Sequence, residues 1–366
     1  MTDARIESEL RTALSRVIDP EIRKPITELD MIGAISVESG AATIDLRLTI
    51  VGCPAADTIE RDVRAAAATV ADVTALDLRV GVMSREQRDA LTARLKGTRT
   101  SQFGTDSLTR ILCVTSGKGG VGKSSLTANL AVALARRGLS VGLMDADVHG
   151  FSIPGLLGIP GEKPTRVGEL ILPPVAHDVK VISIGMFTEP GTAVSWRGPM
   201  LHRTIQQFLT DVFFGDLDVL LIDLPPGTGD VAISLGQLLP QAEVLVVTTP
   251  QAAAADVAER SALVARQTGQ TVVGVVENMA GLVQPDGTVL HLFGEGGGEA
   301  VAGRLGVPLL ASVPLSMALR EGGDNGMPVV LADPEDPAAV ALDALAATLG
   351  TRERGLAGRR LGLSVT

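Results

Sequence analysis

The nine residues from Gly117 to Ser125, G-K-G-G-V-G-K-S-S, constrain the fold more than any other stretch of this 366-residue chain. They fit the pattern G-x-x-x-x-G-K-[ST], in which successive backbone N–H groups cradle phosphate oxygens. The apolar run Ile111 to Val114 precedes the loop, and a helix-like stretch, Ser124 to Arg136, follows it. A strand, a glycine loop and a helix in this order predict a phosphate-binding loop at a positive helix N-terminus. The alternative is an ordinary glycine-rich turn.

The residue types in this loop suggest a task for each polar side chain. Lys123 can reach the β- and γ-phosphates of a nucleotide, and the Ser124 hydroxyl can ligate Mg²⁺. A second lysine, Lys118, follows the first glycine, although the chain has few lysines and many arginines. A compact ammonium is therefore favoured at both places, with a solvated loop lysine as the alternative for Lys118. The predicted nucleotide-binding residues of the loop are Gly117, Lys118, Gly119, Gly120, Val121, Gly122, Lys123, Ser124 and Ser125.

Composition narrows the fold class and the partners. Hydrophobic residues make up 45% of the chain, but the aromatic ones are only seven Phe and one Trp. A mostly aliphatic core suits a parallel sheet covered by helices on both faces. A net charge of −10 argues against nucleic acid as a partner, and no apolar run is long enough to span a membrane. With two widely separated cysteines and no signal-peptide pattern, we expect a cytoplasmic protein.

The N-terminal region reads as a small α+β domain. Apolar residues recur at helical spacing from Ile6 to Val17, and two strand-like runs follow at 31–37 and 42–50. A helix from Pro54 to about Val70 and a strand over 76–82 complete an α-β-β-α-β order. The predicted domains are an α+β domain over 1–85, a linker over 86–107 that begins with a charged helical segment, a P-loop domain over 108–350 and a basic, disordered tail over 351–366.

The P-loop domain alternates strand-like and helix-like segments. This alternation predicts a doubly wound, mostly parallel α/β sheet, in which ligands lie beyond the carboxyl ends of the strands. The expected strands lie at 111–114, 141–144, 179–184, 217–222, 244–247, 272–276 and 309–313, and helices between them include 200–213, 231–239 and 252–266.

Polar residues follow three of these strand-like runs. Asp145 and Asp147 lie two residues apart after the second run, where carboxylates can approach Mg²⁺ or an attacking water. Asp223 ends an apolar run in D-V-L-L-I-D-L-P-P-G-T-G-D, and Gly227 then leaves a backbone N–H free near a γ-phosphate. Asn278 ends a later run, and its amide can pair with the edge of adenine. The alternatives are a helix N-cap for Asp147 and a turn asparagine for Asn278.

These motifs resemble, in family order, those of the MinD/ParA/Mrp ATPases, and the chain is identified as a member of the Mrp/ApbC family of iron–sulfur cluster carriers. The resemblance implies an ATP-hydrolysing homodimer joined through its nucleotide face, in which Lys118 reaches the partner's phosphates. It also implies that Asp147 orients or activates the hydrolytic water, that Asp145 and Asp223 support Mg²⁺ and that Asn278 reads adenine. Apo iron–sulfur proteins are the implied clients.

The first domain resembles the small iron–sulfur-assembly domain that is often fused ahead of Mrp-type ATPases. The resemblance is carried by Asp19-Pro20-Glu21 and Cys53-Pro54. A thiol at a helix start has its thiolate favoured, so Cys53 is a candidate cluster ligand, with a buried structural cysteine as the alternative. The C-x-x-C of many family members is missing, because the interval from Ala280 to His291 has no cysteine. Cys113 lies within a strand-like run, and we expect it to be buried and inert.

Three functions stay open at this point. The first is an ATPase that carries iron–sulfur clusters. The second is a nucleotide-gated adaptor that handles client proteins without a cluster. The third is a spatial organiser of the MinD or ParA kind, which the overall charge and the glycines of the tail disfavour.

Overall fold

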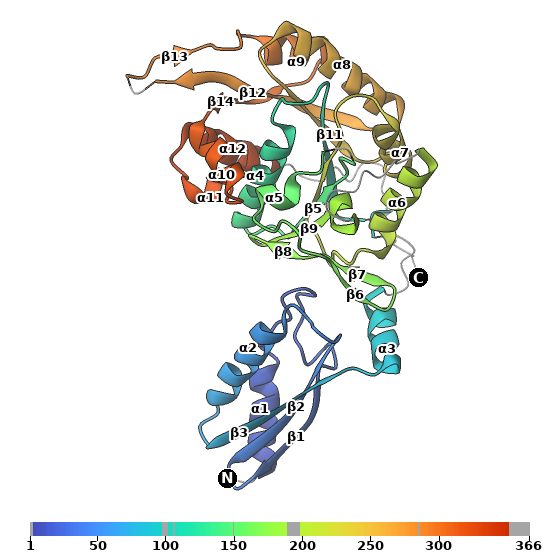
Figure 1. The fold of residues 1–366 in the computed structure, drawn as a ribbon, viewed down its shortest axis with the longest axis vertical. Helices are drawn as coiled ribbons and strands as arrows, with labels where there is room; N and C mark the ends of the chain where they lie inside the picture. The colour runs from blue at the N-terminus through green and yellow to red at the C-terminus, as the bar shows by residue number, and fades with distance from the viewer. Residues whose placement is uncertain are drawn as a thin grey trace, which may run out of the picture. The chain divides into compact units, whose positions relative to one another are not determined.

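The computed structural model describes residues 3–96, 102–104, 107–148, 150–188, 198–284 and 286–350 (Figure 1). They fall into two compact units. The first unit comprises residues 1–100, 164–174 and 211–215, and the second comprises 101–163, 175–210 and 216–366. The domain boundaries expected from the sequence stay a prediction. The tail over 351–366 and His149 lie outside the described residues.

The N-terminal part of the first unit has the predicted α-β-β-α-β order. Strand β2 pairs antiparallel with β1 and parallel with β3. Helix α1 places Ile6, Leu10 and Leu14 on one buried face, because residues four apart share a side of a helix. The elements are α1 (Asp3–Leu14), β1 (Ile32–Glu38), β2 (Ala41–Leu48), α2 (Ala56–Ala68) and β3 (Ala75–Val82), followed by the charged helix α3 (Arg85–Lys96).

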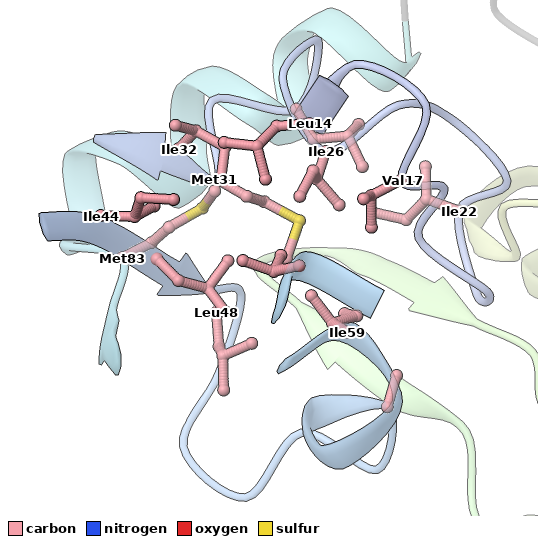
Figure 2. Close-up of a cluster of buried hydrophobic side chains, with 14 of the residues drawn as sticks. Leu14, Val17, Ile22, Ile26, Met31, Ile32, Ile44, Leu48, Ile59 and Met83 are labelled. Atoms are coloured by element: carbon pink, nitrogen blue, oxygen red, sulfur yellow. The ribbon is translucent and has the colours of Figure 1, made fainter. Parts of the chain in front are cut away.

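A short hairpin from the middle of the chain completes the core of the first unit. Its strands are β6 (Thr165–Val167) and β7 (Leu170–Leu172), and Val167, Leu170 and Leu172 are each 1% exposed. They belong to the same buried cluster as Leu14 and Ile59, part of which Figure 2 shows. Phe213 joins this cluster, and its N–H donates to the Ile171 carbonyl at 2.8 Å. The sequence did not predict this hairpin.

The second unit is built on a nine-stranded sheet, which confirms the predicted α/β class. The strand order is β13-β12-β11-β4-β10-β5-β9-β8, and β14 also pairs with β12. Pairs within the sheet are parallel except β12 with β13 and β8 with β9. The strands are β4 (Arg110–Ser116), β5 (Val141–Asp145), β8 (Val175–Ala176), β9 (Val179–Ser183), β10 (Val219–Asp223), β11 (Glu243–Thr248), β12 (Thr271–Val283), β13 (Val289–Leu290) and β14 (Leu309–Leu315).

Helices cover both faces of this sheet, as a doubly wound fold requires. Figure 1 shows α4, α10, α11 and α12 gathered on one side of the central strands and α7, α8 and α9 on the other. The helices are α4 (Lys123–Arg136), α5 (Ile153–Leu156), η1 (Ile184–Phe187), α6 (Gly198–Asp211), α7 (Asp230–Leu238), α8 (Ala252–Gln267), α9 (Gly297–Leu305), α10 (Met317–Asp324), α11 (Val329–Ala332) and α12 (Pro337–Gly350). Among the described residues, no helix has the length and apolar character needed to cross a bilayer.

Strand β12 is longer than the run expected at 272–276. It continues through Asn278 and Met279, where Met279 takes a positive φ of 57°, and its end pairs antiparallel with β13. The cysteine-free interval therefore forms an arm of two strands (Figure 1). A backbone hydrogen bond closes this arm, since the Gln284 N–H donates to the Thr288 carbonyl at 2.8 Å. Pro285 lies outside the described residues.

Candidate nucleotide-binding site

The phosphate-binding loop lines a cavity at the carboxyl ends of the central strands. The loop follows β4 and leads into α4, whose N-cap is Gly122 with a φ of 77° that favours glycine. The cavity has a volume of about 230 Å³. It brings together most residues expected from the sequence and adds Ser116, Gly150 and Pro226; its lining is Ser116, Lys118, Gly119, Gly120, Val121, Gly122, Lys123, Ser124, Ser125, Asp147, Gly150 and Pro226.

Lys123 is held by the aspartate that ends β10. Its Nζ lies 2.7 Å from Oδ2 of Asp223 and 3.2 Å from Oγ of Ser124. Ser124 donates to the same Oδ2 at 2.6 Å, and Thr127 donates to Oδ1 at 3.0 Å. Burial raises the pKa of Asp223, while the Lys123 ammonium opposes that rise. The serine hydroxyl and the carboxylate form an all-oxygen donor set of the kind that suits Mg²⁺.

Thr127 was not predicted as a member of this group. It lies four residues after Lys123, so it is on the same face of α4 as the lysine. That spacing was a readable signal in the sequence.

The two aspartates after β5 have different environments. Asp145 is fully buried and accepts hydrogen bonds from Ser183 Oγ at 3.1 Å, from Asp147 N at 3.1 Å and from Ile153 N at 3.3 Å. Burial and the neighbouring Asp223 raise the pKa of Asp145 to about 7. Asp147 lines the cavity and accepts the Gly150 N–H at 3.1 Å, so it closes a turn and is not the cap of α5. A role for Asp145 at Mg²⁺ stays a prediction.

Helix α8 braces the loop from behind. The Ser261 hydroxyl lies 3.3 Å from the carbonyl oxygens of both Ser116 and Gly227. Gly227 is not free as expected, because its N–H donates to the Ser116 carbonyl at 2.8 Å. Its contact with a γ-phosphate stays a prediction that requires this bond to open. Ser261 carries no signal in the sequence, since a serine in an alanine-rich helix looks ordinary.

Gly117 is required for the contact between the loop and α8. A Cβ at this position would overlap the backbone of Val257 and Ala258, with the Ala258 Cα only 2.8 Å away. Gly117→Ala is therefore expected to lower the free energy of unfolding by about 1–3 kcal/mol, the usual cost of overpacking, and to weaken ATP binding. Urea unfolding measures the first effect. Gly119→Ala is the control for stability, because a Cβ there has 4.0 Å to its nearest neighbour, Pro226. Equal stability of the two variants would contradict the prediction.

Asn278 lies against the loop and not at the cavity wall. It is 4% exposed, and its Nδ2 donates to the Val121 carbonyl at 2.9 Å. A Cβ on Gly122 would collide with this amide. The structure thus gives Asn278 a part in holding the loop, and its pairing with adenine stays a prediction.

Cys53 is buried in the first unit, at 5% exposure, just before α2. Its Sγ lies 3.9 Å from Oε2 of Glu21, and Oε1 of Glu21 accepts a hydrogen bond from Thr165 of the hairpin at 2.7 Å. Burial, with smaller contributions from Glu21 and Asp19, raises the pKa of the thiol. The expectation of a favoured thiolate at this place was therefore wrong, because the cost of burying the charge outweighs the helix start. Within the described residues, no three or more His, Cys, Asp or Glu side chains gather as a metal site. The role of Cys53 as a cluster ligand stays a prediction.

Both free thiols are expected to react slowly with iodoacetamide in the folded protein. Cys113 is fully buried in β4 as predicted, and burial raises its pKa from 9.0 to about 12. Because the thiolate is the nucleophile, its alkylation at pH 8 should be about a thousandfold slower than that of free cysteine. Cys53 should react faster than Cys113. Because its pKa is raised, its reaction rate should still increase with pH above the pKa of an ordinary thiol. Mass spectrometry after timed labelling checks this, with urea-unfolded protein as the control; equal rates would contradict it.

The fold and this cavity together define a P-loop NTPase. A family model described as "NUBPL iron-transfer P-loop NTPase" matches residues 107–350, and one described as "Iron-sulfur cluster assembly protein" matches residues 7–78. The chain belongs to the first of these families, the NUBPL-type iron-transfer P-loop NTPases, and carries an iron–sulfur-assembly segment ahead of the NTPase part. This confirms the family expected from the sequence motifs.

Individual relatives agree with this assignment. A Mycobacterium tuberculosis protein named "Iron-sulfur cluster carrier protein" is 54% identical, over 100% of this chain and 98% of its own length. The Archaeoglobus fulgidus nucleotide-binding protein in complex with ADP is 38% identical over 59% of this chain and 86% of that one, with a TM-score of 0.53. The septum site-determining protein MinD of Pyrococcus horikoshii, complexed with Mg-ADP, is 27% identical over 66% of this chain and 96% of that one, with a TM-score of 0.51.

Proposed function

We propose that this protein is an ATPase that binds iron–sulfur clusters and transfers them to apoproteins. One observation carries the proposal. The same chain contains a cavity lined by Lys118, Lys123 and Asp147 and an iron–sulfur-assembly segment. The full-length similarity to the mycobacterial carrier supports the same function. The cluster is the cargo of this reaction and the apoprotein its acceptor. The proposed compartment is the cytoplasm, where the two free cysteines would stay reduced.

The side chains of the cavity divide the work of hydrolysis between them. Backbone N–H groups of the loop bind the phosphates. When ATP binds, the Lys123 ammonium leaves its ion pair with Asp223 and contacts the β- and γ-phosphates. Ser124 and, through water, Asp223 would hold Mg²⁺, which neutralises phosphate charge when bound. Asp147, fixed by its bond to the Gly150 N–H, orients the attacking water. Turnover is proposed to be slow, because the site is completed only when a second subunit closes over it.

The homodimer is part of this proposal and rests on Lys118. Lys123 is 6% exposed and has a buried partner, whereas Lys118 is only half-buried and forms no ion pair within the described part of the chain. Its ammonium at the rim of the cavity is free to meet the phosphates bound by a second copy. Analytical ultracentrifugation with ATP and with ADP tests this, because Lys118→Ala should abolish an ATP-dependent dimer. A dimer that persists in Lys118→Ala would remove the lysine from this role.

The cluster function is tested by measuring iron and acid-labile sulfide per chain after anaerobic reconstitution. Wild type is compared with Cys53→Ala and with Cys113→Ala, which removes the other thiol. Bound cluster in wild type and in Cys113→Ala, lost in Cys53→Ala, would support a carrier that uses the thiol of the first unit. A cluster that survives in Cys53→Ala would remove Cys53 from the ligand set.

A nucleotide-gated adaptor is the second candidate. It is favoured by the missing C-x-x-C and by the lack of a three-ligand metal group within the described residues. With Cys113 fully buried inside β4, Cys53 is the thiol left to bind iron. Two copies of it in a dimer supply two ligands, and a four-ligand iron site needs two more. Absence of iron from all three proteins, together with normal ATP hydrolysis, would select the adaptor.

A further inference from the structure

An aromatic ring beside the loop that carries Asp147 lies against a glycine from another segment. Phe151 follows this loop directly, and its ring lies over Gly185 in η1, just after β9. A Cβ on Gly185 would come within 2.7 Å of the Phe151 Cγ and Cε2 atoms, and the three nearest atoms around it all belong to this ring. The contact is therefore possible only with glycine at position 185.

The residues beside Phe151 are anchored to the two aspartates. Before it, the Gly150 N–H donates to Asp147 Oδ1 at 3.1 Å. Two residues after it, the Ile153 N–H donates to Asp145 Oδ2 at 3.3 Å. Phe151 thus lies between two residues whose backbone N–H groups are bonded to the aspartates.

Gly185 is fixed to the same aspartate from the other side. Its N–H donates to Ser183 Oγ at 3.1 Å, and that hydroxyl donates to Asp145 Oδ2 at 3.1 Å. Two sets of contacts therefore connect Asp145 with Phe151. One runs through Ser183 and Gly185 to the ring, and the other through the Ile153 N–H. The first of these is rigid, because β5 and β9 are paired neighbours in the sheet.

Phe151 gains little from burial in this position. Its side chain is 45% exposed, so the ring is not a core residue that the hydrophobic effect alone would keep in place. What distinguishes its position is the close fit of the ring on the bare Gly185.

We propose that Phe151 and Gly185 form a latch that positions Asp147 at the nucleotide cavity during ATP hydrolysis. Both are positioning residues, which act through Asp147 and touch no substrate. The proposal rests on the proposed ATPase function. It predicts that loosening the latch lowers turnover without changing ATP binding, because the phosphate-binding loop is untouched.

The test is a cycle of variants read by steady-state ATPase kinetics and by titration with a fluorescent ATP analogue. Gly185→Ala displaces the ring and Phe151→Ala removes it, so each should lower kcat by roughly 10- to 100-fold, the usual effect of misplacing a reacting group by about 1 Å. KM and nucleotide affinity should stay within about twofold of wild type. In the double variant the new methyl group meets no ring, so its kcat should equal that of Phe151→Ala alone.

Gly155→Ala is the matched control. Gly155 lies in the adjacent α5, and a Cβ there would meet nothing within 4 Å, so its kinetics should match wild type. Wild-type kcat in Gly185→Ala would overturn the latch. So would loss of nucleotide binding together with kcat, or additive losses in the double variant.

Hydrogen exchange separates failure of the latch from failure of the ATPase function. The amides of Gly150 and Ile153 are bonded to the two aspartates, so Gly185→Ala should speed their exchange at least tenfold and Gly155→Ala should not. If wild type hydrolyses no ATP, the proposed function fails, and this measurement still decides whether the ring holds the loop. Unchanged exchange in Gly185→Ala would overturn the latch independently of activity.

Discussion

Lys123→Ala is expected to abolish ATP binding and also to destabilise the protein. In the proposed function the ammonium binds the β- and γ-phosphates, and in the structure it neutralises Asp223, which is fully buried. Removing one partner of a buried ion pair costs about 3–5 kcal/mol, because the other charge stays in a low dielectric. Calorimetric titration with ATP and urea unfolding measure the two effects. Retained ATP affinity would contradict the assignment of the loop.

The two effects of Lys123→Ala can be separated in a double variant. Lys123→Ala with Asp223→Asn leaves no unpaired buried charge, so it should recover much of the lost stability while ATP binding stays absent. Recovery of ATP binding would show that the single variant lost it through unfolding alone.

Asp147→Asn is expected to bind ATP with wild-type affinity and to lose turnover. The asparagine keeps an oxygen for the Gly150 N–H, so the turn survives, but it cannot activate water. The loss of a group that orients or deprotonates the attacking water is expected to lower kcat by roughly 100-fold or more. Phosphate release under saturating ATP measures it, and normal hydrolysis would remove Asp147 from the catalytic residues.

A matched control for this change lies on the arm formed by β12 and β13. Like Asp147, Asp286 accepts a nearby backbone N–H and closes a turn; its donor is Thr288, two residues further on, at 2.9 Å. Asp286→Asn should therefore have wild-type turnover. A similar loss in both variants would show that the effect of Asp147→Asn is not specific to the site.

Most of the residues that line the cavity could be predicted from the sequence because their signals are local. The glycine loop between a strand and a helix, and the aspartates that end β5 and β10, are each legible within a dozen residues. In a parallel sheet, residues at carboxyl strand ends must meet at one edge, so their proximity followed from the alternation of elements. The order of elements over residues 3–82 was equally local.

The features that the sequence did not predict depend on contacts between distant segments. The strands β6 and β7 have three residues each, which is too short for any periodicity. The core residues against which they pack are far away in the chain. Ser261 and Gly185 matter only because another segment approaches them closely. The extension of β12 was not predicted, because its backbone is irregular after Asn278. Met279 and Gly281 have positive φ values, which a regular strand pattern does not lead one to expect.

The hairpin in the core of the first unit bears on how the chain is synthesised. Residues 3–96 leave the ribosome first, but Val167, Leu170, Leu172 and Phe213 belong to the same core and emerge much later. At about 5–20 residues per second, the unfinished core waits for several seconds with apolar surface open to solvent. Transiently exposed apolar surface of this kind promotes aggregation, so this interval is the vulnerable step of synthesis. For the same reason, a segment cut at residue 96 would expose the apolar surface that Val167, Leu170 and Leu172 cover in the full chain.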